Sequence, residues 1–264
     1  MNTVGILVIG NEILDGVILD TNSQWIIQQL KPLNYIVTES ITVRDDTAEI
    51  ARAINRMHQD SINMVITTGG LGPTHDDMTL IGVAEAFNLP MELNETAYSI
   101  VERQYRHYYE RGIVGTPEIT DARRKMAVFP EGAIPLDNRA GGAPGVLLDR
   151  GDISTISLPG VPSELKWIFE NQLLPILKRK MQGHYYEKII HLNLRDESTL
   201  APLIDEAMHT DSNVYIKSMV KPYGEAGIRL WISAHGEDPT EIKQRVEKIA
   251  ELLKELTRDQ VFTD

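Results

Sequence analysis

The sequence contains no cysteine. Disulfide bonds, cysteine-ligated zinc, iron–sulfur clusters and thiol catalysis are therefore excluded for this chain. The sequence also has no uninterrupted apolar run near the roughly 18 residues that a membrane helix needs. Its first ten residues lack a basic leader and a small-residue cleavage site, so we expect no signal peptide. These absences predict a cytoplasmic protein with no membrane partner.

Basic residues are scarce relative to acidic ones: 26 Lys and Arg stand against 38 Asp and Glu, which gives a formal net charge of −12. This balance argues against general binding to nucleic acid or to an anionic membrane. A small anionic ligand stays compatible with it where local amides, cations or a metal offset the acidic field. The sequence also lacks the Gly-x-x-x-x-Gly-Lys-Ser/Thr, Gly-x-Ser-x-Gly and His-Glu-x-x-His motifs.

The first two-thirds of the chain alternate between strand-like and helix-like segments. Apolar stretches bounded by turn residues predict strands, and apolar positions at helical spacing predict the helices between them. The expected strands are 3–10, 35–43 and 63–67, a hairpin of 146–148 with 153–158, and the expected helices are 22–30, 47–57, 79–87, 94–111 and 162–180. Residues 130–145 are rich in Gly and Pro and are expected to be mostly loop. This order predicts an α/β fold with a mainly parallel sheet flanked by helices on both faces.

The remaining residues follow a different order. Strands are expected at 188–194, 214–219 and 227–234, with helices at 199–209 and 239–256. This βαββα order predicts a small second α+β domain. The predicted domains are therefore 1–182 and 183–264.

A glycine-rich loop follows the third expected strand and precedes a helix. Gly69, Gly70 and Gly72 lack a Cβ atom, so their backbone amides can approach a phosphate closely. The N-terminus of the next helix is expected to add partial positive charge. The alternative is an ordinary tight turn. The context favours a site for a phosphate-bearing, nucleotide-like small molecule.

Polar residues beside this loop change the chemistry. Thr68 and Thr74 supply hydroxyl groups, and Asp76 and Asp77 place two carboxylates next to the predicted phosphate site. Carboxylates repel phosphate unless a divalent cation lies between them, as magnesium commonly does. The pair therefore predicts a metal site, and the alternative is that one of the acids caps the following helix.

Three other segments are expected at the same edge of the sheet, because ligands bind beyond the carboxyl ends of parallel strands. Glu12 follows the first strand, and its alternative role is that of a solvated loop acid. Asp45 follows the second strand, and the alternative is that Asp45 or the adjacent Asp46 only caps the next helix. Gly142 and Gly145 belong to a second glycine-rich segment that either adds amides or is a structural turn.

Six segments of the chain, taken in their order along the sequence, resemble the CinA-type branch of the molybdopterin-binding superfamily. They are Gly10-Asn11-Glu12-Ile13-Leu14, Asp20-Thr21-Asn22, Val43-Arg44-Asp45-Asp46, Thr67-Thr68-Gly69-Gly70-Leu71-Gly72-Pro73-Thr74-His75-Asp76-Asp77-Met78-Thr79, Ala143-Pro144-Gly145 and Leu158-Pro159-Gly160-Val161-Pro162-Ser163-Glu164. The resemblance implies a three-layer molybdopterin-binding-like domain and a KH-like tail. It also implies self-association into a homo-oligomer. The acidic balance of the tail argues against RNA binding.

CinA-type members resemble metal-dependent ADP-ribose or dinucleotide pyrophosphatases, whereas other members adenylylate molybdopterin or insert molybdenum. Asp45 and Asp77 match important acids of the molybdopterin enzymes, and the three loop glycines match their phosphate cradle. Asp76 stands where an arginine commonly precedes the matched acid in those enzymes, which favours a metal-binding pair. The nicotinamide-mononucleotide deamidase domain of many CinA proteins is not matched, so we do not expect that activity.

The leading hypothesis is hydrolysis of a nucleotide diphosphate bond, with ADP-ribose-like substrates and magnesium, manganese or cobalt as the cation. Catalytic roles are assigned to Asp77, Asp45 and Glu12, and metal binding to Asp76 and Asp77. Ligand-binding roles are assigned to Thr68, Gly69, Gly70, Gly72, Pro73, Thr74, Gly142, Gly145, Pro159 and Gly160. The alternatives are molybdopterin binding or adenylyl transfer, and a non-catalytic protein that binds a nucleotide-like ligand.

Overall fold

The computed structural model describes residues 2–192, 194, 197–219 and 227–257. The chain folds into two compact units. The larger unit comprises Asn2–Leu30 and Tyr35–Met181, and the smaller unit comprises Lys31–Asn34 and the described residues from Gln182 onward. Within the described ranges, no helix is both long and apolar enough to cross a membrane.

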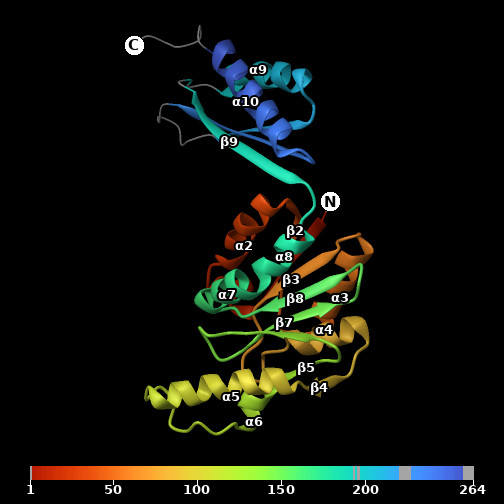
Figure 1. The fold of residues 1–264 in the computed structure, drawn as a ribbon, viewed down its shortest axis with the longest axis vertical. Helices are drawn as coiled ribbons and strands as arrows, with labels where there is room; N and C mark the ends of the chain where they lie inside the picture. Colours follow the sequence, from red (N-terminus) through yellow and green to blue (C-terminus); the bar gives the residue numbers. More distant parts are fainter. Residues whose placement is uncertain (1, 193, 195–196, 220–226, 258–264) are drawn as a thin grey trace. The chain divides into compact units, whose positions relative to one another are not determined.

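A six-stranded sheet forms the centre of the larger unit (Figure 1). Its order is β2 (Tyr35–Val43), β1 (Asn2–Ile9), β3 (Met64–Thr68), β8 (Ser154–Leu158), β7 (Gly145–Asp149) and β6 (Ile134–Leu136). Neighbours among the first four strands are parallel, whereas β7 and β6 are antiparallel to the strands beside them. Every residue of the central strand β3 is buried, as expected for a strand covered on both faces. The predicted mainly parallel α/β sheet is confirmed.

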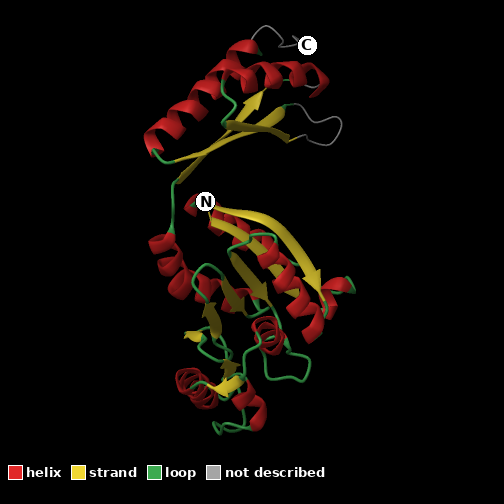
Figure 2. Cartoon of the chain, turned by 90° about the vertical axis from the view of Figure 1, so that its right-hand side faces the viewer, coloured by secondary structure: helices red, strands yellow, loops and turns green. Residues whose placement is uncertain are grey.

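Helices cover both faces of this sheet (Figures 1 and 2). One face carries α2 (Asn22–Leu30), α7 (Pro162–Ile168), the π-helical η2 (Phe169–Leu173) and α8 (Leu174–Lys180), and the other carries α3 (Thr47–Gln59) and α4 (Thr79–Phe87). On the first face, the rings of Trp25 and Phe169 meet edge-on with centroids 5.2 Å apart. On the second, α3 buries Ile50, Ala53, Ile54 and Met57, which recur at the spacing of one helical face.

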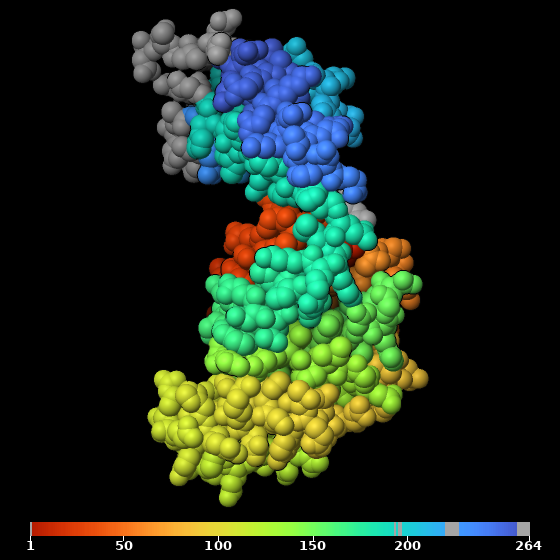
Figure 3. Space-filling view, in the orientation of Figure 1, coloured from red at the N-terminus to blue at the C-terminus, as the bar shows by residue number. Residues whose placement is uncertain are grey.

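A peripheral layer completes the larger unit. It contains β4 (Met91–Leu93) paired with β5 (Val128–Pro130), α5 (Glu95–Glu110) and α6 (Asp121–Lys125). In the space-filling view, the yellow α5 segment forms an outer surface of this unit (Figure 3). The short α1 (Asn11–Leu14) follows β1 directly.

The smaller unit is an antiparallel sheet of order β10 (Val214–Met219), β11 (Ile228–Gly236) and β9 (His184–Leu192). Figure 2 shows its helices α9 (Glu197–Thr210) and α10 (Pro239–Leu256) on one face of that sheet. The 3-10 turn η1 (Lys31–Leu33) also belongs to this unit, where the Asn34 side chain donates to the carbonyl of Gln182 at 2.7 Å. The described elements follow the expected βαββα order, which confirms the predicted α+β tail.

Candidate functional site

The carboxyl ends of the four parallel strands lie level with one another. Ile9 of β1 pairs with Val43 of β2, and Thr68 of β3 pairs with both Val8 and Leu158. The loops that follow these strands therefore open at one rim of the sheet, where ligands of such folds bind. The structure brings together at this rim the loops predicted from strand order alone.

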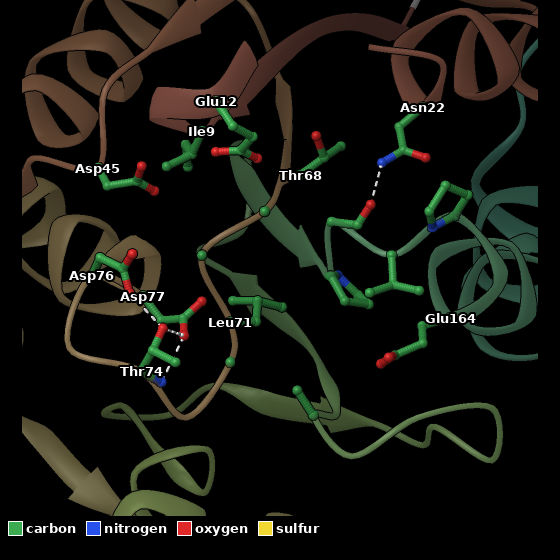
Figure 4. A pocket seen from close by; sticks show the side chains of 18 of the residues that line it. Ile9, Glu12, Asn22, Asp45, Thr68, Leu71, Thr74, Asp76, Asp77 and Glu164 are labelled. Atoms are coloured by element: carbon green, nitrogen blue, oxygen red, sulfur yellow. Dashed lines mark hydrogen bonds between the residues drawn. The ribbon is translucent and has the colours of Figure 1, made fainter. Parts of the chain in front are cut away.

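A cavity of about 720 Å³ opens at this rim, which is a typical volume for a small-molecule site. Its walls come from the loops after β1, β2, β3 and β8, with further residues from α5 and from the glycine-rich segment before β7. Figure 4 shows several of the lining side chains around the glycine loop.

The glycine loop holds a conformation that an L side chain rarely adopts. Gly69 has φ +99° and Gly70 has φ +63°. Thr79 fixes both residues: its hydroxyl donates to the Gly69 carbonyl at 2.8 Å, and its amide donates to the Gly70 carbonyl at 3.2 Å. The Gly69 amide donates to the carbonyl of Leu158 at 3.0 Å. The loop is therefore clamped between the start of α4 and the end of β8.

The glycine loop also has backbone amides without a hydrogen-bond partner. The backbone amides of Gly70, Leu71 and Gly72 form no hydrogen bond to any described residue, and all three residues line the cavity. Consecutive unpaired amides of this kind form an anion-binding concavity. Leu80 and Ile81 of the first turn of α4 line a second cavity of about 320 Å³ together with Gly70, Leu71, Gly72 and Asp77, and no residue of α4 lines the main cavity. Gly70, Leu71 and Gly72 therefore border both cavities, and they bring unpaired backbone amides to the wall of the main one.

The two adjacent acids after the glycine loop meet at one hydroxyl group. The Thr74 hydroxyl oxygen lies within hydrogen-bond distance of Asp76 and 2.6 Å from Oδ2 of Asp77, so the two carboxylates share its single proton, and Oδ2 of Asp77 also accepts the Thr74 amide at 2.8 Å. The hydrogen bond from Thr74 is the main cause that lowers the pKa of Asp76, so this acid is ionised at neutral pH. Neither acid caps α4, whose N-cap is Met78 without a side-chain bond. Both carboxylates are thus held together at the cavity wall.

The two acids after β2 have different roles. Asp46 caps α3 by accepting the Glu49 amide at 2.9 Å, whereas Asp45 lines the cavity and accepts the Asn11 amide at 2.8 Å. Glu12 lines the same cavity from α1. Figure 4 shows Glu12 and Asp45 near Ile9, at the same rim as Asp76 and Asp77.

The loop after β8 is tied to the start of α2. Asn22 is buried, and its side-chain amide donates to the Gly160 carbonyl at 2.8 Å (Figure 4). Asp20 caps α2 by accepting the amides of Asn22 and Ser23 at 3.0 and 3.1 Å. Gly160 lies so close to the glycine loop that a Cβ on it would be 3.4 Å from the α-carbon of Gly69. The hydrogen bonds of Asp20 and Asn22 at the start of α2 therefore also position a wall of the cavity.

Nearly all the residues assigned to the site from sequence line this cavity. They are Glu12, Asp45, Thr68, Gly69, Gly70, Gly72, Pro73, Thr74, Asp76, Asp77, Gly142, Pro159 and Gly160. Gly145 does not line it: it begins β7, and a Cβ on it would be 3.0 Å from Ile168. His75 has a side chain that is 97% exposed and is also outside the lining.

The structure adds lining residues that had no assigned role. Tyr105 and Tyr108 of α5 line the cavity. Met126 and Glu164 line it as well. Glu164 had a signal in the sequence, because it ends the last of the six family-like segments.

The charged side chains that line the cavity are all acidic. Among its described lining residues are six carboxylates and no lysine, arginine or histidine; the acids are Glu12, Asp20, Asp45, Asp76, Asp77 and Glu164. Lys125 lines the second cavity, and its ammonium group donates to the Thr74 carbonyl. A phosphate in this cavity would face carboxylates without a neutralising side chain. The lining therefore suits a cationic partner, such as a metal ion, alongside any anionic ligand.

Glu164 provides a test of the electrostatics by pH. Burial raises the pKa of this carboxyl, and a hydrogen bond from Asn138 partly opposes the effect. A raised folded-state pKa means that stability falls as the pH rises from the unfolded-state pKa through the folded-state pKa. Glu164→Gln should therefore raise the melting temperature relative to wild type at pH 7, with a smaller gain near pH 4, where the acid is largely protonated in both states. Equal gains at both pH values, measured by calorimetry, would contradict this cause.

Comparison with known proteins places this geometry in a family. A family model described as "Probable molybdopterin binding domain" matches residues 5–179. A protein of Pyrobaculum arsenaticum is 38% identical over 98% of this chain and 97% of its own length. A protein of Sulfurisphaera tokodaii is 37% identical over 95% of this chain and 93% of its own length.

A solved structure is similar in both sequence and fold. The crystal structure of the protein CinA from Thermoplasma acidophilum is 32% identical, with a TM-score of 0.59, over 66% of this chain and 99% of that one. The part of this chain that matches the CinA structure is about as long as the part that matches the family model, residues 5–179. The chain therefore belongs to the molybdopterin-binding-domain family and carries that domain in a CinA-like form.

Proposed function

We propose that this protein hydrolyses the diphosphate bond of an ADP-ribose-like nucleotide with the help of a divalent cation. The observation that carries the proposal is the combination of three unpaired loop amides with an acidic lining that contains no basic side chain among its described residues. The amides of Gly70, Leu71 and Gly72 suit phosphate oxygens. The carboxylates suit a hard cation that would offset their repulsion of the phosphates.

The donor chemistry of the site fits magnesium or a similar ion. Asp76 and Asp77 both accept from the Thr74 hydroxyl, so their carboxylates are close enough to share one cation. Among the described residues, no group of three or more histidine, aspartate or glutamate side chains is arranged to hold a metal. This pattern fits magnesium, which commonly takes one or two carboxylates together with phosphate oxygens and water. When bound, such a cation polarises the phosphoryl group and stabilises the negative charge that develops on it.

The reaction requires a base that accepts a proton from the attacking water. The water oxygen forms a bond to one phosphorus as the bridging P–O bond breaks, so that ADP-ribose yields AMP and ribose 5-phosphate. Glu12 is the favoured base, because its carboxylate has no hydrogen-bond partner among the described residues, whereas Asp45 already accepts the Asn11 amide. Asp45 is then the residue that orients the loop carrying Glu12.

A second candidate function is molybdopterin binding or adenylyl transfer to it. The match of residues 5–179 to the molybdopterin-binding domain favours this candidate. The same loop amides would hold its phosphate. Consumption of ATP only when pterin is present would support transfer, and tight ligand binding without turnover would support a non-catalytic role.

The hydrolysis is tested by incubating the purified chain with ADP-ribose and following AMP by chromatography. We expect AMP release with magnesium, manganese or cobalt, and its loss when EDTA is added, because the uncompensated carboxylates then repel the diphosphate. Release that is insensitive to EDTA would contradict the role of a cation. No release with any of the three metals would contradict hydrolysis of this substrate.

A further inference from the structure

Glu164 lies apart from Asp76 and Asp77, the two acids of the cavity that we assign to the cation. Figure 4 shows its carboxyl group on one side of Leu71, with Asp45, Asp76 and Asp77 on the other. It forms no ion pair with any described residue. The cavity therefore has two chemically different ends, and the glycine loop lies between them.

The protein holds this carboxyl in place with neutral groups. The side-chain amide of Asn138, which is fully buried, donates to Oε2 of Glu164 at 2.8 Å and to the Ala143 carbonyl at 2.7 Å. Asn138 Oδ1 accepts the amides of Ala140 and Gly141 at 2.9 Å each. A Cβ on Gly141 would be 1.8 Å from the Glu164 carboxyl carbon, so the loop packs directly on the acid. Glu164 is thus a fixed hydrogen-bond acceptor.

The neighbouring wall is aromatic. Tyr105 and Tyr108 also line the cavity, and their rings meet edge-on with centroids 5.7 Å apart. The charge of Glu164 is among the causes that raise the pKa of Tyr108, after burial, which places the two side chains near each other. A Cβ on Gly142 would be 3.4 Å from the ring of Tyr105. An aromatic wall beside a fixed acceptor suits a heterocycle that carries an N–H donor.

We propose that Glu164 is a specificity-determining residue that accepts a hydrogen bond from an exocyclic amino group on the ring of the ligand. This inference rests on the proposed nucleotide-like ligand, whose phosphates would lie on the amides of Gly70 to Gly72. A ring without that amino group leaves Oε1 of the half-buried carboxyl without a partner, because Asn138 donates only to Oε2, and this weakens binding. Two ring types carry such a group: the 6-aminopurine of adenine, and the 2-amino-4-oxo ring that guanine shares with pterins.

Binding of AMP, GMP and IMP to the whole chain tests the inference by calorimetry with magnesium present. These monophosphates contain no diphosphate bond, so the result does not depend on hydrolysis. IMP lacks both amino groups, and GMP differs from IMP only by its 2-amino group. We expect AMP or GMP to bind about tenfold more tightly than IMP. A preference for AMP identifies a 6-amino ring, and a preference for GMP identifies the 2-amino-4-oxo pattern.

Variants assign this preference to the carboxyl. Glu164→Leu should reduce the preference to less than about twofold, while Asn138 keeps its bond to the Ala143 carbonyl. Glu164→Gln retains one acceptor oxygen and should keep part of the preference, and it replaces the leucine variant if that fails to fold. Glu170→Leu is the matched control, because Glu170 is exposed and outside the cavity.

Three results would overturn the inference: equal binding of the three nucleotides by wild type, a preference that survives Glu164→Leu, or no binding of any of them. A clear preference that depends on Glu164, in a protein that releases no AMP from ADP-ribose, would overturn the hydrolysis alone. The failure of the two proposals is therefore distinguishable.

Discussion

Replacing Asp77 with asparagine is expected to lower the rate of AMP release from ADP-ribose by roughly 100-fold or more, the loss typical when a group that organises charge at the reacting centre is removed. The reason is the lost negative charge beside Asp76, which weakens the hold on the cation. The fold should persist, because the asparagine oxygen can still accept the Thr74 amide and hydroxyl that Asp77 accepts at 2.8 and 2.6 Å. Initial rates at several magnesium concentrations measure the effect.

The control is Asp152→Asn, which removes one charge from an exposed residue outside the cavity. It should leave both the rate and its magnesium dependence unchanged. If Asp77 acts through the cation, more magnesium should restore part of the lost rate in Asp77→Asn. A normally folded Asp77→Asn protein with the wild-type rate would rule out its proposed role.

The main features of the fold could be predicted from the sequence because they depend on long periodic segments. Buried strands such as Met64–Thr68 and amphipathic helices such as Thr47–Gln59 are recognisable without tertiary information. The short strands β4, β5 and β6 were not predicted. Each has three residues, which is too few to show a period, and their pairing depends on contacts with distant segments.

The site could be predicted in part for a similar reason. Strand order alone placed the loops of Glu12 and Gly69 at one rim, but it could not decide which of Asp45 and Asp46 caps α3, because both stand where a cap is possible. The structure decides this through the bond from the Glu49 amide to Asp46.

The position of Tyr105 and Tyr108 in the cavity wall could not be predicted from the sequence. Tyr105 and Tyr108 stand three residues apart, which indicates only that they share one face of a helix. The direction of that face depends on how α5 packs in the peripheral layer, so the sequence pattern fits equally well with packing against the core and with lining the cavity.

Replacing Gly69 with alanine is expected to destabilise the larger unit by more than about 3 kcal/mol and to abolish AMP binding. Its φ of +99° is unfavourable for alanine, and the added Cβ would be 2.1 Å from the carbonyl oxygen of Ile9. Because this contact is with backbone, no side-chain rotation relieves it. The loop must shift, and the amides of Gly70 and Leu71 shift with it. Urea denaturation followed by the fluorescence of Trp25 and Trp167, in a Trp231→Phe background, reports on this unit.

Gly132→Ala is the control that separates the cost of the steric clash from the cost of the positive φ. Gly132 also has a positive φ, +77°, but an added Cβ there meets nothing within 4 Å. Its replacement should cost only the roughly 1–2 kcal/mol of a left-handed alanine and leave AMP binding intact. If Gly69→Ala were no more destabilising than Gly132→Ala, this would contradict the close packing of the glycine loop against the Ile9 carbonyl. If Gly69→Ala were destabilised as expected yet still bound AMP with wild-type affinity, the loop amides would not be the phosphate donors, because their positions cannot survive the displacement that the new Cβ requires.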